Sequence, residues 1–393
     1  MLVSRVEPSL RFLGRFYRFM YEVPVRWSKE NWKLYTSPKR KWILYYVSMS
    51  IVTSLWLTCV YTLPTQLFLH RKTFGIVQAC ILTTGFGAFT VTMAVGNAIC
   101  DRSVESKIFA VNQYLHIESA LYTKYKPNTG GSKPLDSLDI ILFIIQLGNF
   151  IPFLILFACL YWDLDGPYWV IEDFAPSAMY REPRTILAFL VVRALLLMVG
   201  FWETTRTITG SAMIMFTAID SMTFFVKTLT YKVKSVKIFF RYYTHVSILC
   251  NALEGSSTLS FFLTITTGYY LWILWIWVCV NGFGKLELPL YFLFLLATFI
   301  VGMAVLIYLP KVAVMGEAIT KMPNMKRIEM RKKYTAWKSI ENKIAVKKSN
   351  AIRPFRFQYG SFYPMGSNFS RNTFGNMIEN AITVILLFDI DKQ

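Results

Sequence analysis

Long apolar runs recur along the chain and predict helices that cross a membrane. An apolar run of about 20 residues spans the hydrocarbon core of a bilayer as a helix. Seven segments reach or approach that length: 42–63, 74–99, 138–162, 185–219, 259–280, 289–309 and 372–388. The runs are continuously apolar, whereas the strands of a membrane barrel alternate between apolar and polar residues. We therefore predict an all-α fold, a seven-transmembrane helical bundle, whose fourth helix continues into the cytoplasm.

The uneven distribution of Lys and Arg predicts the orientation of this bundle. Of the 42 basic residues, 34 lie before the first span or after the second, fourth and sixth spans, and only six lie in the opposite set of loops. Basic residues are retained on the cytoplasmic side of a membrane. We therefore expect a cytoplasmic N-terminus and an extracellular C-terminus. A G-protein-coupled receptor has the opposite orientation, and the chain carries neither a DRY nor an NPxxY motif.

Composition agrees with a membrane protein and disfavours an enzyme. Hydrophobic residues make up 54% of the chain and charged residues only 17%, against about 25% in an average soluble protein. The net charge of +19 is explained by inner loops that face anionic membrane lipid, so no nucleic-acid partner is expected. The six cysteines are scattered singly and only three histidines exist. We predict no catalytic residues, no metal site and no cofactor.

The basic segment before the last span, residues 310–371, combines charge with apolar spacing. Trp337, Ile340 and Ile344 recur between the charged residues, which indicates a partly helical segment. Together with extensions of the preceding helices it would form a cytoplasmic platform. The alternative is a solvated basic linker.

The seventh span has a regular polar face. Its polar residues, spaced by three and four along a helix, are Asn376, Glu379, Asn380 and Thr383. A carboxylate within a membrane-spanning helix normally faces a bundle interior or an aqueous path, so Glu379 is a candidate functional residue. Several subunits, each contributing this helix, would line a conduit with these residues and Leu387, with Val384 and Leu387 as gate residues. Asp389 and Asp391 would then ring the outer mouth and attract cations. The alternative is a hydrogen-bonded seam between helices of one subunit.

The tail of the chain carries a family resemblance. It contains Arg353-Pro354-Phe355 and then Gly360-Ser361-Phe362-Tyr363-Pro364-Met365, followed by the short polar helix. With seven spans and a basic block before the last one, this resembles the insect odorant and gustatory receptor superfamily. The gustatory branch of this superfamily usually has a Thr-Tyr pair at the start of the last span and a Gln-Phe pair at its end. This chain has Asn372-Thr373-Phe374 and Leu387-Phe388-Asp389 there, so the odorant and gustatory branches both stay open.

The resemblance implies a function and an assembly. Members are ligand-gated, non-selective cation channels of the plasma membrane, built as homo- or hetero-tetramers, in some cases with a co-receptor. Their seventh helices line a central pore, their cytoplasmic segments join the subunits, and an odorant or tastant enters a pocket in the outer half of each bundle. Residues 1–41 then form a cytoplasmic segment, 42–309 the ligand-binding bundle, 310–371 the anchor, and 372–393 the pore helix and extracellular end. A G-protein-coupled receptor and, less favoured, a transporter are the alternatives.

Residues that the predicted orientation places in the outer halves of the spans are candidates for the ligand pocket. They are Gln78, Tyr161, Trp162, Arg193, Trp272, Trp275 and Tyr291. For the aromatic residues the alternative is the interfacial belt, where Trp and Tyr collect irrespective of function. An unpaired guanidinium in a span is costly, so we expect Arg193 to bind a polar ligand group or to pair with Glu172 or Asp173.

Overall fold

The computed structural model of the chain confirms a helical multi-span fold. It describes residues 12, 15–17, 20–28, 33–69, 75–101, 103–125, 143, 146, 148–174, 183–253, 256–334, 340–350, 358–359, 363–364 and 367–387. Within these residues, six segments are helical, long and apolar enough to cross a membrane. They correspond to the first six apolar runs of the sequence. Five of them lie in α2 (Trp42–Leu69), α3 (Ile76–Cys100), α8 (Pro183–Lys227), α10 (Ser256–Asn281) and α11 (Leu288–Tyr334). The third, Phe153–Phe174, is formed by α6 (Ile151–Trp162) together with the short helix α7 (Gly166–Phe174) that follows it.

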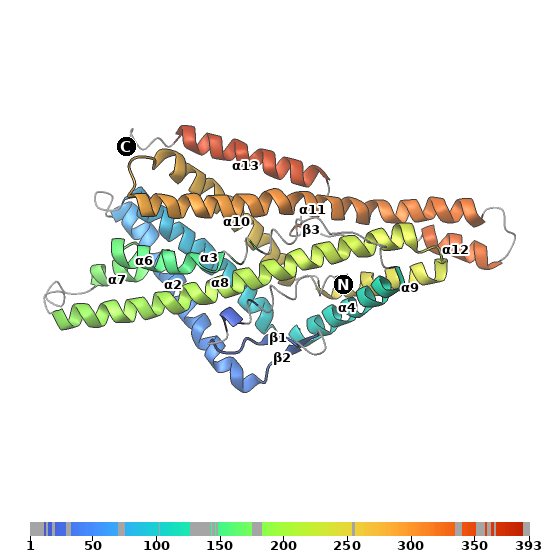
Figure 1. Cartoon of the computed structure of the whole chain (residues 1–393), viewed down its shortest axis with the longest axis horizontal. Helices are drawn as coiled ribbons and strands as arrows, with labels where there is room; N and C mark the ends of the chain where they lie inside the picture. Colours follow the sequence, from blue (N-terminus) through green and yellow to red (C-terminus); the bar gives the residue numbers. More distant parts are fainter. Residues whose placement is uncertain are drawn as a thin grey trace.

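The helix at the seventh run, α13 (Ser367–Leu387), is 21 residues long, which is the length that a crossing needs. Its polar residues keep it below the hydropathy of the other six helices, and it is not one of the six candidate spans. It lies along the outside of the bundle beside α11 (Figure 1).

Two helices are much longer than a membrane is thick. Helix α8 has 45 residues and α11 has 47, and at about 1.5 Å per residue each extends roughly 70 Å. Both run along the long axis of the molecule, and α4 (Val104–Tyr125), α9 (Val236–Leu253) and α12 (Ile340–Asn350) gather near one end of them (Figure 1). A short π-helical turn, Thr228–Lys232, joins the end of α8 to α9. The fourth and sixth helices therefore extend beyond the spans, as the sequence predicted for the fourth.

The buried side chains form two separate cores. One core, at the end that holds α4 and α9, includes Phe225, Phe239 and Met322, all nearly inaccessible. The other joins α2, α3, α6, the first half of α8, α10 and the beginning of α11, and includes Val52, Phe89 and Trp277. Because the second half of α11 contributes buried residues to the first core, that part of the chain is packed rather than a solvated linker.

A small hairpin precedes the first long helix, and the apolar pattern gave no sign of it. Strands β1 (Val25–Trp27) and β2 (Leu34–Thr36) pair antiparallel, with Val25 opposite Thr36 and Trp27 opposite Leu34. The 3₁₀ turn η1 (Lys39–Lys41) connects β2 to α2. The remaining elements are the short helix α7 (Gly166–Phe174) and a second strand pair, β3 (Gln358–Tyr359) with β4 (Tyr363–Pro364).

One buried carboxylate in the first core predicts a pH effect on stability. Burial raises the pKa of Glu118 on α4, opposed by a hydrogen bond with Ser221. The folded state therefore holds the proton more tightly than the unfolded state does. The Glu118 carboxyl therefore contributes most to the free energy of unfolding below its unfolded-state pKa of 4.5. This contribution declines as the pH rises through its folded-state pKa.

We expect Glu118→Gln to raise the melting temperature at pH 7.5 by about 2 °C, because the neutral amide avoids burying a charge. The gain should vanish near pH 4, where the wild-type carboxyl is protonated. Thermal unfolding of the purified protein at both pH values measures this. Glu105→Gln, at an exposed position of the same helix, is the control. A destabilised Glu118→Gln variant at pH 7.5 would contradict the argument.

Candidate ligand cavity and pore helix

Helix α13 packs one face against the bundle and exposes the other. It contacts α10 and α11. On the packed face, Met377 and Ala381 are buried, and Val384 and Ile385 contact the second core. Val384, predicted to line a conduit, is thus half-buried against its own subunit. The side chain of Leu387 and the residues Asp389 and Asp391 lie outside the part of the chain that the structure describes.

The exposed face of α13 is the polar face that the sequence predicted. Asn376, Glu379, Asn380 and Thr383 are all exposed. Asn380 Nδ2 donates a hydrogen bond to the Tyr269 hydroxyl of α10, and Thr383 Oγ1 donates to the backbone oxygen of Glu379 at 2.8 Å. A seam within one subunit therefore explains Asn380 but not the other three residues. The side chains of these three residues are exposed, and no other helix in the described part of the chain covers them.

The outer-half candidates do not converge on one site. Tyr161 is 77% exposed on α6, and its ring lies edge-on to that of Trp162, which contacts the second core. The indole of Trp275 donates to Thr84 of α3 at 2.9 Å, and that of Trp272 donates to the Thr298 carbonyl of α11 at 3.2 Å. These two indoles hold helices together.

Two further outer-half candidates also lie apart. The Gln78 carbonyl accepts a hydrogen bond from the Gly75 amide at the start of α3. Tyr291 lies near the start of α11 with its ring 5.8 Å from that of Phe283. Neither contact connects its residue with the tryptophans. The described contacts therefore give these seven candidates no common cavity.

Arg193 has partners other than the expected ones. Its side chain is 3% exposed, and its Nε atom donates to Asp165 Oδ2 at 2.7 Å. Its NH1 atom donates to Asp163 Oδ1 at 2.6 Å and its NH2 atom to the Cys159 carbonyl at 2.7 Å. The expected pairing with Glu172 or Asp173 is wrong, because the guanidinium binds the corner between α6 and α7 rather than the end of α7. With all three nitrogens engaged, Arg193 is a link between α8 and this corner.

A cavity of about 110 Å³ lies between α6 and α8. Its apolar lining comes from Phe153, Leu156, Phe157, Met198, Phe201 and Trp202, and its polar lining from Tyr17, Asn149 and Thr205. For comparison, an engineered apolar cavity of about 150 Å³ in another protein holds a benzene molecule. Two of its lining residues, Phe157 and Met198, are also exposed on the surface, so a bound molecule could extend beyond the enclosed volume.

The N-terminal segment contributes Tyr17 to the polar side of the cavity. The Tyr17 hydroxyl donates to Asn149 Oδ1, and the Asn149 amide donates to the Gln146 carbonyl at 3.1 Å. Sequence reasoning missed all nine lining residues. Asn149, an amide inside the third apolar run, was the one available signal. An apolar cavity with few polar groups is the usual form of a small-molecule site.

Close to this cavity, the N-terminal segment binds a buried ion pair of α8. Glu203 is fully buried and pairs with Arg206 one turn away, as the i, i+3 spacing suggests. The Tyr21 hydroxyl donates to Glu203, and Arg206 NH1 donates to the Tyr21 carbonyl at 3.1 Å. The guanidinium carbon also lies 4.5 Å from the centre of the Tyr21 ring. The segment before the hairpin is thus fixed to the middle of α8.

Comparison with known proteins identifies the fold. No family model matches the chain, and no curated protein matches it. Among solved structures it is similar to the insect olfactory receptor OR5 from Machilis hrabei, with a TM-score of 0.60 and 9% identity over 98% of this chain and 99% of that chain. The same receptor in complex with eugenol gives a TM-score of 0.55 and 10% identity over the same shares. The chain therefore has the fold of an insect olfactory receptor, and the resemblance noted in its sequence is confirmed at the level of fold.

The buried arginine predicts a stability defect rather than a ligand defect. Arg193→Met would leave Asp165 buried and Asp163 nearby without their cation, and breaking a buried pair in this way costs about 3–5 kcal/mol. We expect a strong loss of folded protein at the cell surface, with part restored by Asp165→Asn in the same chain. Arg184→Met, at an exposed position of α8, is the control. If Arg193→Met reached the surface normally and changed only ligand potency, the structural role would be wrong.

Proposed function

We propose that the chain is a chemosensory receptor of the odorant type that acts as a subunit of a ligand-gated, non-selective cation channel in the plasma membrane. The exposed polar face of α13 is the observation that carries this proposal. Elsewhere the bundle exposes Leu, Ile and Phe side chains, which suit lipid. A row of amides, a hydroxyl and a carboxylate would be costly there, and it suits an aqueous path.

Four copies arranged with these faces around an axis would enclose a pore. Asn376, Glu379 and Thr383 would line it, with Asn380 at its side because of the bond to Tyr269. Leu387 would form the narrow apolar gate, and Asp389 and Asp391 the outer mouth, on the orientation predicted from charge. Because Val384 packs against its own subunit, we propose that it holds the pore helix in place and does not line the pore. Similarity in fold to an insect olfactory receptor supports this arrangement.

Glu379→Gln tests the pore. A ring of carboxylates raises the local concentration of cations, so its neutralisation should lower cation conductance and weaken block by divalent cations without reducing the amount of protein at the surface. Patch-clamp recording of expressed receptors measures both. Glu172→Gln, an exposed carboxylate on α7, is the matched control. Identical permeation in Glu379→Gln would exclude this residue from the pore.

The cavity between α6 and α8 is the proposed ligand site. Its aromatic and aliphatic lining suits a small apolar molecule, and Tyr17, Asn149 and Thr205 could orient one polar group. The complex of the similar receptor with eugenol makes eugenol a reasonable first probe. The outer-half candidates remain a second location, favoured by the family resemblance, although Arg193, Trp272 and Trp275 already have partners within the bundle.

A cavity-filling substitution tests the ligand site. Met198→Trp places an indole at the edge of the cavity and should lower the potency of an active ligand by at least about tenfold, which corresponds to about 1.4 kcal/mol. Leu195→Trp, on the exposed surface of α8 and outside the lining, should leave potency unchanged. Dose–response curves from an odorant panel that includes eugenol provide the measurement. Equal effects of the two substitutions would place the ligand elsewhere.

A further inference from the structure

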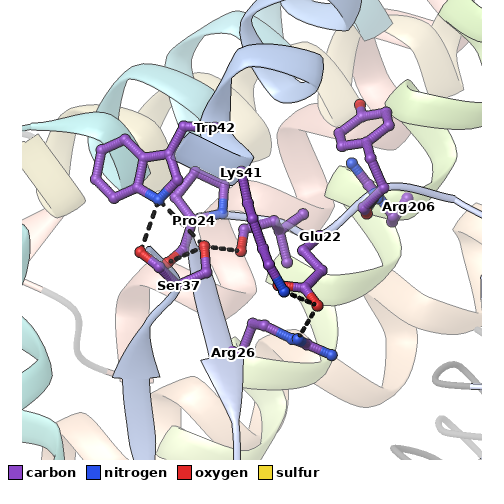
Figure 2. Close-up of polar contacts among 9 residues, drawn as sticks. Glu22, Pro24, Arg26, Ser37, Lys41, Trp42 and Arg206 are labelled. Atoms are coloured by element: carbon purple, nitrogen blue, oxygen red, sulfur yellow. Dashed lines mark hydrogen bonds and ion pairs between the residues drawn. The ribbon is translucent and has the colours of Figure 1, made fainter. Parts of the chain in front are cut away.

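The hairpin before α2 concentrates positive charge. Arg26 and Lys33 belong to or border its strands, and η1 is formed by Lys39, Arg40 and Lys41. We call residues 22–28 and 33–41 the cationic hairpin. Its one described carboxylate is Glu22, whose Oε1 atom binds Arg26 NH1 at 2.7 Å and Lys41 Nζ at 2.9 Å (Figure 2).

Three cations of the cationic hairpin remain available. Lys33, Lys39 and Arg40 are exposed, and none has an ion-pair partner among the described residues. Their exposed side chains are within reach of an anion outside the chain.

The beginning of α2 sets the level of these cations in the bilayer. Directly after η1, Ile43 is 64% exposed and Leu44 is 59% exposed, and Val47 follows one turn later with 51%. Such exposed side chains on a membrane-length helix belong in hydrocarbon. Lys39 precedes Ile43 by four residues, a rise of roughly 6–8 Å, so η1 lies at the level of the lipid headgroups. On the orientation predicted from charge, this is the inner leaflet, which carries the anionic lipids.

The cationic hairpin is held rigidly in this position. The Trp42 indole donates to the Ser37 carbonyl at 3.0 Å, and the Ser37 amide donates to the Pro24 carbonyl at 2.8 Å (Figure 2). On the other side, Asn112 of α4 accepts from the Leu34 amide at 2.8 Å and donates to the Leu34 carbonyl at 2.9 Å. Cations fixed in advance lose less conformational freedom when an anion binds.

We propose that the cationic hairpin is a binding site for the phosphate-bearing headgroup of an anionic phospholipid, with Lys33, Lys39 and Arg40 as its ligands. The partner is a membrane lipid rather than a soluble phosphate, because the apolar surface of α2 next to η1 would receive the acyl chains. The position at headgroup level supports the same choice.

The same segment links this lipid site to the proposed ligand cavity. Tyr21, next to Glu22, binds the buried pair Glu203 and Arg206, and Tyr17 lines the cavity. An occupied lipid site would therefore hold the cavity wall in place and favour ligand binding. This consequence rests on the proposed function, whereas lipid binding itself does not.

Lipid binding can be measured without any channel activity. The full-length protein is reconstituted into nanodiscs of phosphatidylcholine that contain either a small fraction of a fluorescent phosphatidylinositol bisphosphate or fluorescent phosphatidylcholine alone. The variant K33Q/K39Q/R40Q should bind the anionic lipid at least about tenfold more weakly than wild type, since each cation near an anionic surface contributes favourably. Because the three side chains are exposed and form no ion pair with any residue that the structure describes, its melting temperature should be unchanged.

A charge-matched variant tests whether the site is specific. K343Q/K347Q/K348Q removes three exposed cations from α12, away from the cationic hairpin (Figure 1), and should bind the anionic lipid as wild type does. Equal losses in both variants, or equal binding of phosphatidylcholine, would overturn the site. Displacement of the lipid by a soluble inositol phosphate at an equal concentration would overturn the choice of a membrane lipid. A changed ligand response with normal lipid binding would instead concern the proposed function.

Discussion

Hydrocarbon offers no hydrogen bonds, and this constraint organises the whole molecule. Backbone groups must bond within their own helix, which explains the predominance of long helices. Buried charges must find partners inside the protein, and helix α8 has two such places. Arg193 is bound by Asp163, Asp165 and the Cys159 carbonyl, and Glu203 pairs with Arg206. Arg193 thereby connects α8 to the corner between α6 and α7, and Tyr21, which bonds to both Glu203 and Arg206, connects it to the N-terminal segment.

The long central helices connect regions with different tasks. Helices α8 and α11 each contribute buried residues to both the first and the second core, so they connect the two cores physically. Helix α13 packs on α10 and α11, while the cavity lies on α6 and α8. The contact of α8 with α11 is therefore a direct physical route from the proposed ligand site to the proposed pore helix.

The N-terminal segment emerges as a third functional region. It contributes Tyr17 to the cavity and Tyr21 to the buried ion pair of α8, and it contains the cationic hairpin that we propose binds lipid. These three features lie within a short stretch of chain. If both proposals hold, the protein would respond to small molecules and also to the lipid composition of the membrane.

Features that depend on local periodicity and charge could be predicted from the order of the residues alone. The apolar runs located the long helices, and the spacing of Asn376, Glu379 and Thr383 defined a polar face of α13 that is indeed exposed. The ion pair of Glu203 and Arg206 likewise joins residues one turn apart on the same helix. Such features follow from neighbours three or four residues apart on the same helix.

Which residues far apart in the sequence contact each other depends on the folded arrangement of the helices. The partners of Arg193 lie 28 and 30 residues away, and Tyr21 meets Glu203 across 182 residues. The cavity draws on three separate segments, so its lining has no common pattern along the chain. The outward direction of the polar face of α13, and the inward position of Val384, likewise depend on how that helix packs against α10 and α11. Packing between helices is set by the summed shapes of many side chains, which no short stretch of sequence records.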